Sequence, residues 1–348
     1  MQYTSSRVRV SVPATSANLG PGFDSMGLAL EVRDEITVEA VASSEVSISI
    51  YGEGEGTLPR DERHLIVRAL RQTQEILGLP QTGLHMEAHN RIPQSRGMGS
   101  SASAIVAGVS AAVAFSGRTD LGKDFIFNVA AQMEGHPDNV APAVYGGLTV
   151  SWNFEAATDI PLSVLDEQSG ATSPKLTVRR EYPEVINGFS DGFHTVTYPV
   201  DGAIHVYMFI PEATLSTKTA RTVLPGKVSY EDAIRNIARA AVLPSALGSA
   251  PGPETNAVLL SATEDRLHQD YRKDLMPDSW QLMTHLRSRG YAAAISGAGP
   301  CVLVFHSSAA DDQIREVTQQ EWISTGRWKM LPVKIDSRGV AISKEEKL

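Results

Sequence analysis

Residues 93–103 read PQSRGMGSSAS and lead directly into the apolar segment 105–115. Glycine lets the backbone turn tightly and come close to a ligand. The start of a helix adds unpaired N–H groups and the positive end of the helix dipole, and both attract phosphate. The stretch therefore predicts a phosphate-binding loop before a central buried helix over residues 100–115. Taken alone, it fits a turn that only caps a helix equally well.

Two common phosphate-binding motifs do not describe this loop. The letters GMGSSA satisfy the dinucleotide pattern G-x-G-x-x-A, but residues 91–96 separate Gly97 from the preceding candidate strand. About 20 residues further on, where an acidic ribose ligand would stand, the chain offers only Asp120, beyond the apolar helix. A Walker loop needs Gly-Lys-Ser or Gly-Lys-Thr, and the chain contains neither tripeptide. Ordinary P-loop ATPases are therefore excluded.

The composition is that of a folded globular protein with two domains. Of the 348 residues, 42% are hydrophobic and 20% are charged. The net charge of −9 argues against binding to nucleic acid or to anionic membranes. Cys301 is the only cysteine, so an intrachain disulfide is impossible and a reducing cytoplasm is expected. The apolar segment 105–115 is shorter than the ~20 residues of a membrane-spanning helix.

The hydrophobic patterns along the chain predict both strands and helices. Alternation of apolar and polar residues indicates strands, and apolar residues three or four apart indicate amphipathic helices. The poorly patterned stretch 159–173 suggests a boundary between domains at 1–165 and 166–348. Strands are expected over residues 7–12, 35–50, 84–88, 148–152, 204–210, 291–295 and 301–305, and helices over 64–77, 100–115, 121–134, 230–243, 264–271 and 281–289.

Three motifs in the same order resemble those of the GHMP kinase superfamily. They are VPATSANLGPGFDSMGLAL (12–30), the phosphate loop, and AAAISGAGPCVLVF (292–305). Within the superfamily, the first motif closely resembles the opening of homoserine kinases. EGHPDNVAPAVYGG (134–147), STKTARTVLP (216–225) and LHQDYRKDLMP (267–277) are similar to homoserine kinases as well. The resemblance covers nearly the whole chain.

The resemblance implies a fold, a reaction and its partners. The fold would be a two-domain α+β fold that combines an N-terminal ribosomal-protein-S5-like nucleotide domain with a ferredoxin-like C-terminal domain. The reaction would use ATP and Mg²⁺ to phosphorylate the side-chain hydroxyl of L-homoserine, giving O-phospho-L-homoserine for threonine biosynthesis. A homodimer is implied in the same way.

The resemblance also assigns the nucleotide and metal ligands. Ser101 and Glu134 would meet at Mg²⁺, which prefers oxygen ligands and takes few of them from the protein. For Glu134 the structural alternative is a surface charge at a helix end. The amides of residues 96–101 would bind phosphate, and the nucleotide-binding loop comprises Pro93, Gln94, Ser95, Arg96, Gly97, Met98, Gly99, Ser100, Ser101, Ala102 and Ser103.

A zwitterionic substrate needs a cation, an anion and neutral polar groups around it. By resemblance, Arg221 and Arg272 would hold the carboxylate of the substrate, and Asp24 would hold its ammonium group. For either arginine alone, a solvated salt bridge is the ordinary explanation. The remaining polar atoms would be bound by Asn18, Asn139 and Thr217.

The proton acceptor is not fixed by these motifs. Asn139 and Glu134 are the expected catalytic residues, but the neutral amide of Asn139 cannot accept a proton. We therefore expect Asn139 to orient the hydroxyl, while a phosphate oxygen or water takes the proton; Asp138 is the adjacent alternative. His136 and His268 have no metal-binding spacing, and the glycines of SGAGP (296–300) fit either a plain hairpin or a loop beside the nucleotide.

Two other functions stay open on the sequence. Another GHMP kinase, acting on a different small alcohol, would keep the phosphate loop but lose the pair Arg221 and Arg272. A non-catalytic nucleotide-binding sensor would not need Ser101, Glu134 and Asn139, all of which are present.

Overall fold

The computed structural model describes residues 7–154, 157–161, 177–181 and 191–345. They fall into two compact units. The larger unit contains the residues up to Ser151 and those from Thr195 onward, and the smaller unit contains residues 152–194. In the smaller unit, β6 (Ala157–Pro161) and β7 (Thr177–Glu181) form an antiparallel pair. The candidate site lies entirely in the larger unit.

Seven of the described strands form one sheet: β1 (Arg7–Asn18), β2 (Gly22–Val41), β3 (Val46–Gly52), β4 (Gly83–Asn90), β5 (Leu148–Phe154), β8 (Gly192–Tyr198) and β13 (Ala341–Glu345). The order is β13-β1-β2-β4-β3, with β5 paired to β2 and β8 paired to β5. Along β1, Val8, Val10 and Val12 are fully buried and alternate with more exposed residues. The period of two that predicted this strand therefore places its valines in the core.

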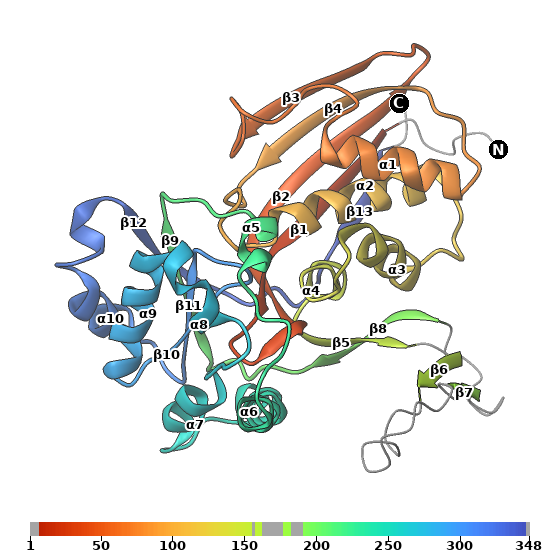
Figure 1. The fold of residues 1–348 in the computed structure, drawn as a ribbon. Helices are drawn as coiled ribbons and strands as arrows, with labels where there is room; N and C mark the ends of the chain where they lie inside the picture. The colour runs from red at the N-terminus through yellow and green to blue at the C-terminus, as the bar shows by residue number, and fades with distance from the viewer. Residues whose placement is uncertain (1–6, 155–156, 162–176, 182–190, 346–348) are drawn as a thin grey trace. The chain divides into compact units, whose positions relative to one another are not determined.

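Helices cover one face of this sheet (Figure 1). They are α1 (Leu65–Ile76), α2 (Ser100–Ser116), α3 (Lys123–Glu134) and α4 (Val140–Tyr145). Helix α1 connects β3 to β4 along the chain. These two strands are parallel and therefore need a crossover connection. Helix α2 is buried on nearly all sides, as its apolar sequence predicts. At Gly108 a Cβ atom would lie 2.3 Å from the carbonyl oxygen of Ile66, so glycine allows α2 to approach α1 closely.

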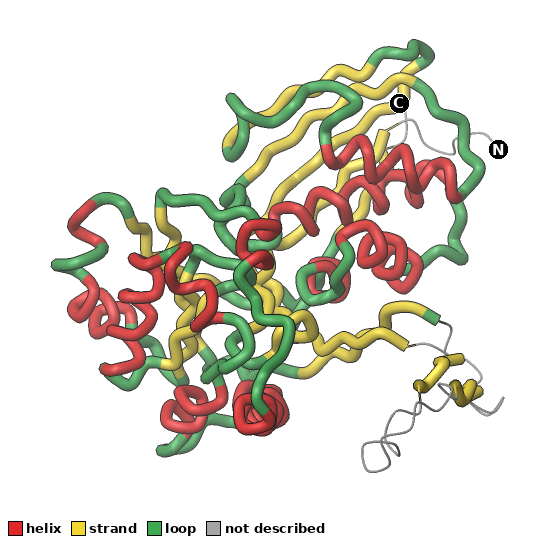
Figure 2. Tube along the Cα trace, in the orientation of Figure 1, coloured by secondary structure: helices red, strands yellow, loops and turns green. Residues whose placement is uncertain are grey.

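A second, antiparallel sheet has the order β10-β11-β9-β12. Its strands are β9 (His205–Pro211), β10 (Ala292–Ile295), β11 (Val302–His306) and β12 (Trp328–Val333). Along β9, Tyr207 and Phe209 share a core with residues of α9 (Pro277–Ser288) and α10 (Asp311–Thr318). Val206 and Met208 share a different core with residues of α6 (Tyr230–Gly248) and α7 (Thr255–Ala262). Helices therefore enclose this sheet on both faces, and Figure 2 shows the strands of both sheets in yellow beside their helices.

The α+β fold and most predicted elements are confirmed, with three differences. The alternating stretch 35–50 is two strands, because β2 ends at Val41 and β3 begins at Val46. The helix predicted over 264–271 is wrong in its first half, and only α8 (Gln269–Arg272) is helical. The reason is that the Asp265 carboxylate accepts hydrogen bonds from the backbone amides of Leu267 and His268, which precede α8. The sequence patterns missed the elements α4, α5 (Thr217–Thr222), α7, α10, β8, β12 and β13.

The domain boundary predicted near 159–173 lies largely outside the described residues. The division into 1–165 and 166–348 therefore stays a proposal. Strand β13 pairs antiparallel with β1, so the last described strand completes the sheet that begins with the first. Among the described residues, no helix combines the length and the apolar character needed to cross a membrane.

Candidate active site

A cavity of about 170 Å³ lies where the predicted motifs come together in space. Five predicted loop residues do not line it: the side chains of Pro93, Met98 and Ala102 are buried, and those of Gln94 and Ser103 line a neighbouring cavity. The predicted residues that do line it are Asn18, Asp24, Ser95, Arg96, Gly97, Gly99, Ser100, Ser101, Glu134, Asn139, Thr217, Arg221 and Arg272.

The phosphate loop ends at the N-terminus of α2. Gly99 precedes the helix in a left-handed conformation (φ 71°), and it has no side chain with which to cap the first turn. A Cβ atom on Gly99 would lie 1.9 Å from Oγ1 of Thr15, so this position requires glycine. Ser100 and Ser101 face the cavity from the first turn. The loop therefore presents an uncapped helix N-terminus to the cavity, which is a favourable site for an anion.

The loop is fixed in place by contacts with both sheets. Thr15 of β1 donates its amide to the Met98 carbonyl over 3.1 Å. Arg96 donates to the backbone carbonyls of Pro211 and Glu212. The hydroxyl of Ser296, in the SGAGP turn, donates to the Gly97 carbonyl over 2.6 Å. The SGAGP turn is therefore both a tight hairpin and a neighbour of the phosphate loop.

Ser101 and Glu134 meet at one side of the cavity. The Ser101 hydroxyl donates to Oε2 of Glu134 over 2.8 Å. Burial raises the pKa of Glu134 above its usual value, and the hydrogen bond from Ser101 opposes the shift. Among the described residues, no cluster of three or more histidine, cysteine, aspartate or glutamate side chains could hold a metal by itself. This pair is therefore a partial oxygen site that needs further ligands from outside the protein.

The turn HPDN orients Asn139 toward the cavity. Thr15 donates its hydroxyl to Oδ1 of Asn139 over 2.8 Å, so the amide nitrogen of that side chain remains a donor. Asp138 accepts a hydrogen bond from the backbone amide of Asn139 over 2.9 Å and pairs with Nδ1 of His136 over 2.7 Å. Although burial opposes it, this pairing with Asp138 raises the pKa of His136 above its ordinary value. Asp138 and His136 also line the cavity, so Asp138 lies within the site and not behind it.

Asp24 and Arg221, predicted to bind opposite charges of one substrate, bind each other in the structure. The two guanidinium nitrogens of Arg221 donate to the two carboxylate oxygens of Asp24 over 2.9 and 2.7 Å. About a third of each side chain is exposed, 37% for Arg221 and 35% for Asp24. Such a bidentate pair is accessible, and a ligand that carries both charges can exchange with it.

Arg272 is buried, with 2% of its surface exposed, and its hydrogen-bond partners are neutral. Its Nε donates to the Ala220 carbonyl over 3.1 Å, and its Nη1 donates to Nδ1 of His268 over 3.0 Å. No carboxylate of the described residues lies within ion-pair distance of Arg272, whose pKa is lowered to about 10 by burial and by the nearby Arg221. A buried cation without an anionic partner, facing a cavity, indicates a site for an anion.

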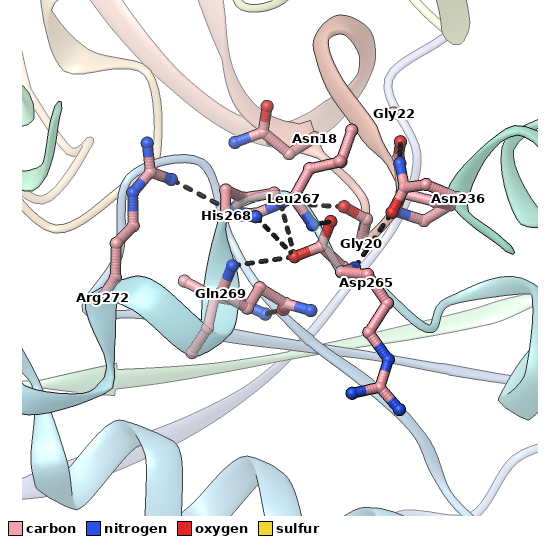
Figure 3. A network of polar contacts seen from close by, with 12 residues as sticks. Asn18, Gly20, Gly22, Asn236, Asp265, Leu267, His268, Gln269 and Arg272 are labelled. Carbon is pink, nitrogen blue, oxygen red and sulfur yellow. Dashed lines mark hydrogen bonds and ion pairs between the residues drawn. The ribbon is translucent and has the colours of Figure 1, made fainter. Parts of the chain in front are cut away.

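A polar network stands behind Arg272 (Figure 3). Asp265 accepts hydrogen bonds from the backbone amides of Leu267, His268 and Gln269. The Nε2 of His268 contacts the Gly20 carbonyl oxygen over 2.8 Å, in the turn between β1 and β2. Asn18, in the same turn, donates its side-chain amide to the Gly297 carbonyl over 2.9 Å. The network therefore joins α8, the β1–β2 turn and the SGAGP turn.

A second cavity, also of about 170 Å³, adjoins the phosphate loop. Its walls include the apolar residues Leu65, Ala104 and Ala107. His64 lines it as well, and Nδ1 of this histidine accepts the Ile66 amide over 3.2 Å, so Nε2 carries the proton. Among the described residues, that buried Nε2 has no hydrogen-bond partner. The second cavity therefore combines apolar walls with polar side chains, among them the buried carboxylate of Asp34 and the unsatisfied donor of His64.

Comparisons with known proteins match regions of the chain that contain the same motifs. The family model described as GHMP kinases N terminal domain matches residues 64–147, and the one described as GHMP kinases C terminal matches residues 253–323. A homoserine kinase of Clavibacter michiganensis is 40% identical over 343 residues, covering 97% of this chain and 95% of that protein. A homoserine kinase of Streptomyces avermitilis is 40% identical over 342 residues, covering 98% and 97%. The chain belongs to the GHMP kinases and, within them, to the homoserine kinase family.

Solved structures agree with the fold of this GHMP kinase. The crystal structure of homoserine kinase from Cytophaga hutchinsonii superimposes with a TM-score of 0.73 at 21% identity, covering 99% of both chains. The mevalonate kinase of Methanococcus jannaschii gives a TM-score of 0.59 at 12% identity, covering 94% of this chain and 98% of its own. The predicted pairing of a GHMP N-terminal with a GHMP C-terminal domain is thereby confirmed.

Three residues of this GHMP kinase's site escaped the sequence analysis as functional candidates. Thr15 was read only as part of a motif, His64 only as the start of a helix, and His268 only as a residue without metal spacing. Each acts through a contact with a residue distant in sequence or through a cavity. The signal available for His64 was its position at the N-terminus of a helix after a charged loop, which does not identify a binding site.

Proposed function

We propose that this GHMP kinase transfers the γ-phosphoryl group of ATP to the hydroxyl of L-homoserine, giving O-phospho-L-homoserine and ADP in threonine biosynthesis. The observation that carries the proposal is one small polar cavity in which Asp24, Arg221 and Arg272 lie beside the uncapped N-terminus of α2. A zwitterion and a phosphate chain would be held next to each other there. The homoserine kinases at 40% identity support the choice of substrate.

The phosphates of ATP bind the N-terminus of α2, and the nucleobase occupies the second cavity. Gly97 and Gly99 let the backbone approach the phosphates, and Ser100 contributes its amide and hydroxyl. The buried Nε2–H of His64 donates to an acceptor nitrogen of the base. Apolar walls at Leu65 and Ala104 pack against the base faces. The two cavities share Ser95, Ser100 and Ser101 in their linings, which fits one continuous ligand.

Mg²⁺ fits the pair Ser101 and Glu134. A hydroxyl and a carboxylate 2.8 Å apart are hard oxygen ligands, and phosphate and water would supply the remaining ligands of the metal. The chemistry that a bound Mg²⁺ supplies is neutralisation of charge on the phosphate oxygens. Glu134 must be ionised to bind it, and the hydrogen bond from Ser101 favours the ionised form.

The acceptor substrate exchanges with the pair of Asp24 and Arg221. Its carboxylate binds Nη2 of Arg272 and draws Arg221 toward it, and its ammonium group takes the place of Arg221 on Asp24. Both protein charges then keep an opposite partner. Asn18 and Thr217 offer neutral polar atoms at the edge of the same cavity.

Asn139 orients the attacking hydroxyl, and a phosphate oxygen or water accepts its proton. Because Thr15 donates to the Oδ1 of Asn139, the side-chain amide of Asn139 can donate to the substrate oxygen. Oδ1 of Asp138 is already hydrogen-bonded to His136 and to the backbone amide of Asn139. If Asp138→Asn abolished turnover while both substrates still bound with their original affinities, Asp138 would be the base instead.

The test is a coupled ADP-release assay with Mg·ATP and a panel of L-homoserine, L-threonine, L-serine, mevalonate and galactose. Wild type is compared with Arg221→Ala, and Arg235→Ala on the exposed face of α6 is the matched control. We expect turnover selective for homoserine that is lost in Arg221→Ala and kept in the control. Activity on a different alcohol would retain the kinase and reject homoserine, and no turnover on any alcohol would support a nucleotide-binding sensor.

We infer a homodimer in addition. Tyr230, Ile234 and Ile237 follow one face of α6 at helical spacing and are 89%, 62% and 68% exposed. Such an apolar stripe is covered when two copies pack through α6. Light scattering should report a dimer at tens of micromolar, and Ile237→Asp should give a monomer; a monomeric wild type would reject this assembly. A cytoplasmic location stays a prediction from the single cysteine, and the absence of nucleic-acid and membrane binding stays a prediction from the net charge of −9.

A further inference from the structure

His268 is a buried histidine that contacts Arg272 of the candidate acceptor site but does not itself line the cavity. Its side chain has no exposed surface, and its ring stacks on Phe23 with the ring centroids 5.3 Å apart. Its two nitrogens contact two different segments, Nδ1 facing Arg272 over 3.0 Å and Nε2 facing the Gly20 carbonyl over 2.8 Å. Figure 3 shows His268 between these two partners.

The two partners fix the protonation state of His268. The Gly20 carbonyl can only accept, so Nε2 must carry a proton; the guanidinium of Arg272 can only donate, so Nδ1 must be bare. His268 is therefore neutral and accepts one hydrogen bond from a cation. Burial lowers its pKa, which agrees with the neutral form.

Arg272 depends on this acceptor for its orientation. Three neutral groups hold it: the Ala220 carbonyl on Nε, His268 on Nη1, and the Gly297 carbonyl on Nη1 over a longer 3.4 Å. These contacts occupy Nε and Nη1 and leave Nη2 as the donor available to the cavity, which Arg272 lines. The guanidinium is planar, so fixing two nitrogens sets the direction of the third.

We propose that His268 is a positioning residue for the acceptor substrate, which orients Arg272 toward the substrate carboxylate by accepting its Nη1 hydrogen bond. The inference rests on the proposed function, because it assumes that Arg272 binds the carboxylate. We expect His268 to act on acceptor binding and not on nucleotide binding, since its hydrogen-bond partners Arg272 and Gly20 do not belong to the phosphate loop. Through Arg272 it also supports the backbone of α5 at Ala220, next to Arg221.

Two amide substitutions separate the two halves of the imidazole. In His268→Asn the side-chain oxygen stands near the place of Nδ1 and can still accept from Arg272, whereas the donor to Gly20 is lost. In His268→Gln the longer side chain reaches the place of Nε2 and can donate to Gly20, whereas the acceptor for Arg272 is lost. We expect the KM for homoserine to rise about tenfold to 100-fold in His268→Gln and clearly less in His268→Asn. The kcat and the KM for ATP stay within about threefold of wild type in both variants.

A double-mutant cycle with Arg272→Ala completes the test. If His268 acts through Arg272, His268→Gln lowers kcat/KM for homoserine no further once Arg272→Ala is present. Full addition of the two losses, equal losses in the asparagine and glutamine variants, or a parallel rise in the KM for ATP would each overturn the proposal. Thermal unfolding of every variant identifies losses due to misfolding, and only variants with a wild-type transition enter the cycle.

Wild-type turnover separates this inference from the proposed function. If wild type does not phosphorylate homoserine, the proposed function fails, and the same ratios are measured with the alcohol that it does phosphorylate. If wild type phosphorylates homoserine and the ratios show no dependence on Arg272, the inference about His268 fails alone.

Discussion

The phosphate loop and the acceptor pocket lie side by side, but they are built in opposite ways. The loop is one continuous stretch, residues 95–101, whose binding groups are backbone amides at the start of a rigid buried helix. The candidate acceptor pocket takes the side chains of Asp24, Arg221 and Arg272 from three distant segments. Arg221 pairs with Asp24, and both guanidinium groups lie over the Phe23 ring. Binding at the loop therefore depends on backbone geometry, whereas binding in the acceptor pocket depends on the exchange of side-chain partners.

The largest effect should come from adding one methyl group to the loop. In Gly99→Ala the new Cβ would lie 1.9 Å from Oγ1 of Thr15 at a positive φ, so the loop must shift away from its phosphate-binding shape. We expect kcat/KM for ATP to fall about 1,000-fold, as when a fixed donor to developing charge is lost. Steady-state kinetics with Gly56→Ala as control measures this, because a Cβ on Gly56 meets nothing within 4 Å. Near-normal activity in Gly99→Ala would show that the loop tolerates backbone change.

Removal of the buried guanidinium should have the next largest effect, and on the other substrate. We expect Arg272→Ala to raise the KM for homoserine about 100-fold, because a charge-assisted hydrogen bond is lost, and to leave the KM for ATP unchanged. Arg289→Ala, at an exposed position after α9, is the control. Equal rises in both KM values would mean that the two regions do not work independently.

These two predictions differ in how far the sequence could support them. The loop was predictable because one contiguous motif contains its glycines, its serines and the helix that follows. The motifs also named Asp24 and Arg221, but not their pairing, which joins residues 197 positions apart. Thr15, His64 and His268 act through contacts that exist only after the sheets and helices pack. Hydrophobic patterns found the long elements and missed short ones such as α4 and α5, whose six residues contain fewer than two full helical periods.

Exchange in the acceptor pocket gives a smaller effect with an unusual sign. Wild type should use 4-hydroxybutanoate poorly, because that acceptor draws Arg221 away from Asp24 and provides no ammonium group in return. In Asp24→Asn the arginine has no such partner, so kcat/KM for 4-hydroxybutanoate should rise about tenfold, or ~1.4 kcal/mol, while kcat/KM for homoserine falls. The assay compares both acceptors in Asp24→Asn and in Asp120→Asn, an exposed control paired with Arg118. A parallel decline with both acceptors would refute the exchange.

The smallest effect is on the pH dependence at the metal side of the site. Burial raises the pKa of Glu134, so as the pH falls this carboxylate protonates earlier than an ordinary glutamate does. Because only the ionised form binds Mg²⁺, activity should decline at a pH above the usual glutamate range, and more Mg²⁺ should move the decline to lower pH. Profiles of kcat/KM for ATP at several Mg²⁺ concentrations test this; an acid limb that is independent of Mg²⁺ would assign it to another group.

The pairing of β13 with β1 affects how the chain can fold during synthesis. Residues 7–11 pair with residues 341–345, so about 330 residues must be synthesised between the two strands before this pairing can form. One edge of the nucleotide-binding sheet therefore stays open for most of translation, and such long-range pairing slows folding. A chain truncated before β13 would leave β1 as an unpaired edge strand. We expect such a chain to aggregate and not to give a separately folded nucleotide-binding half.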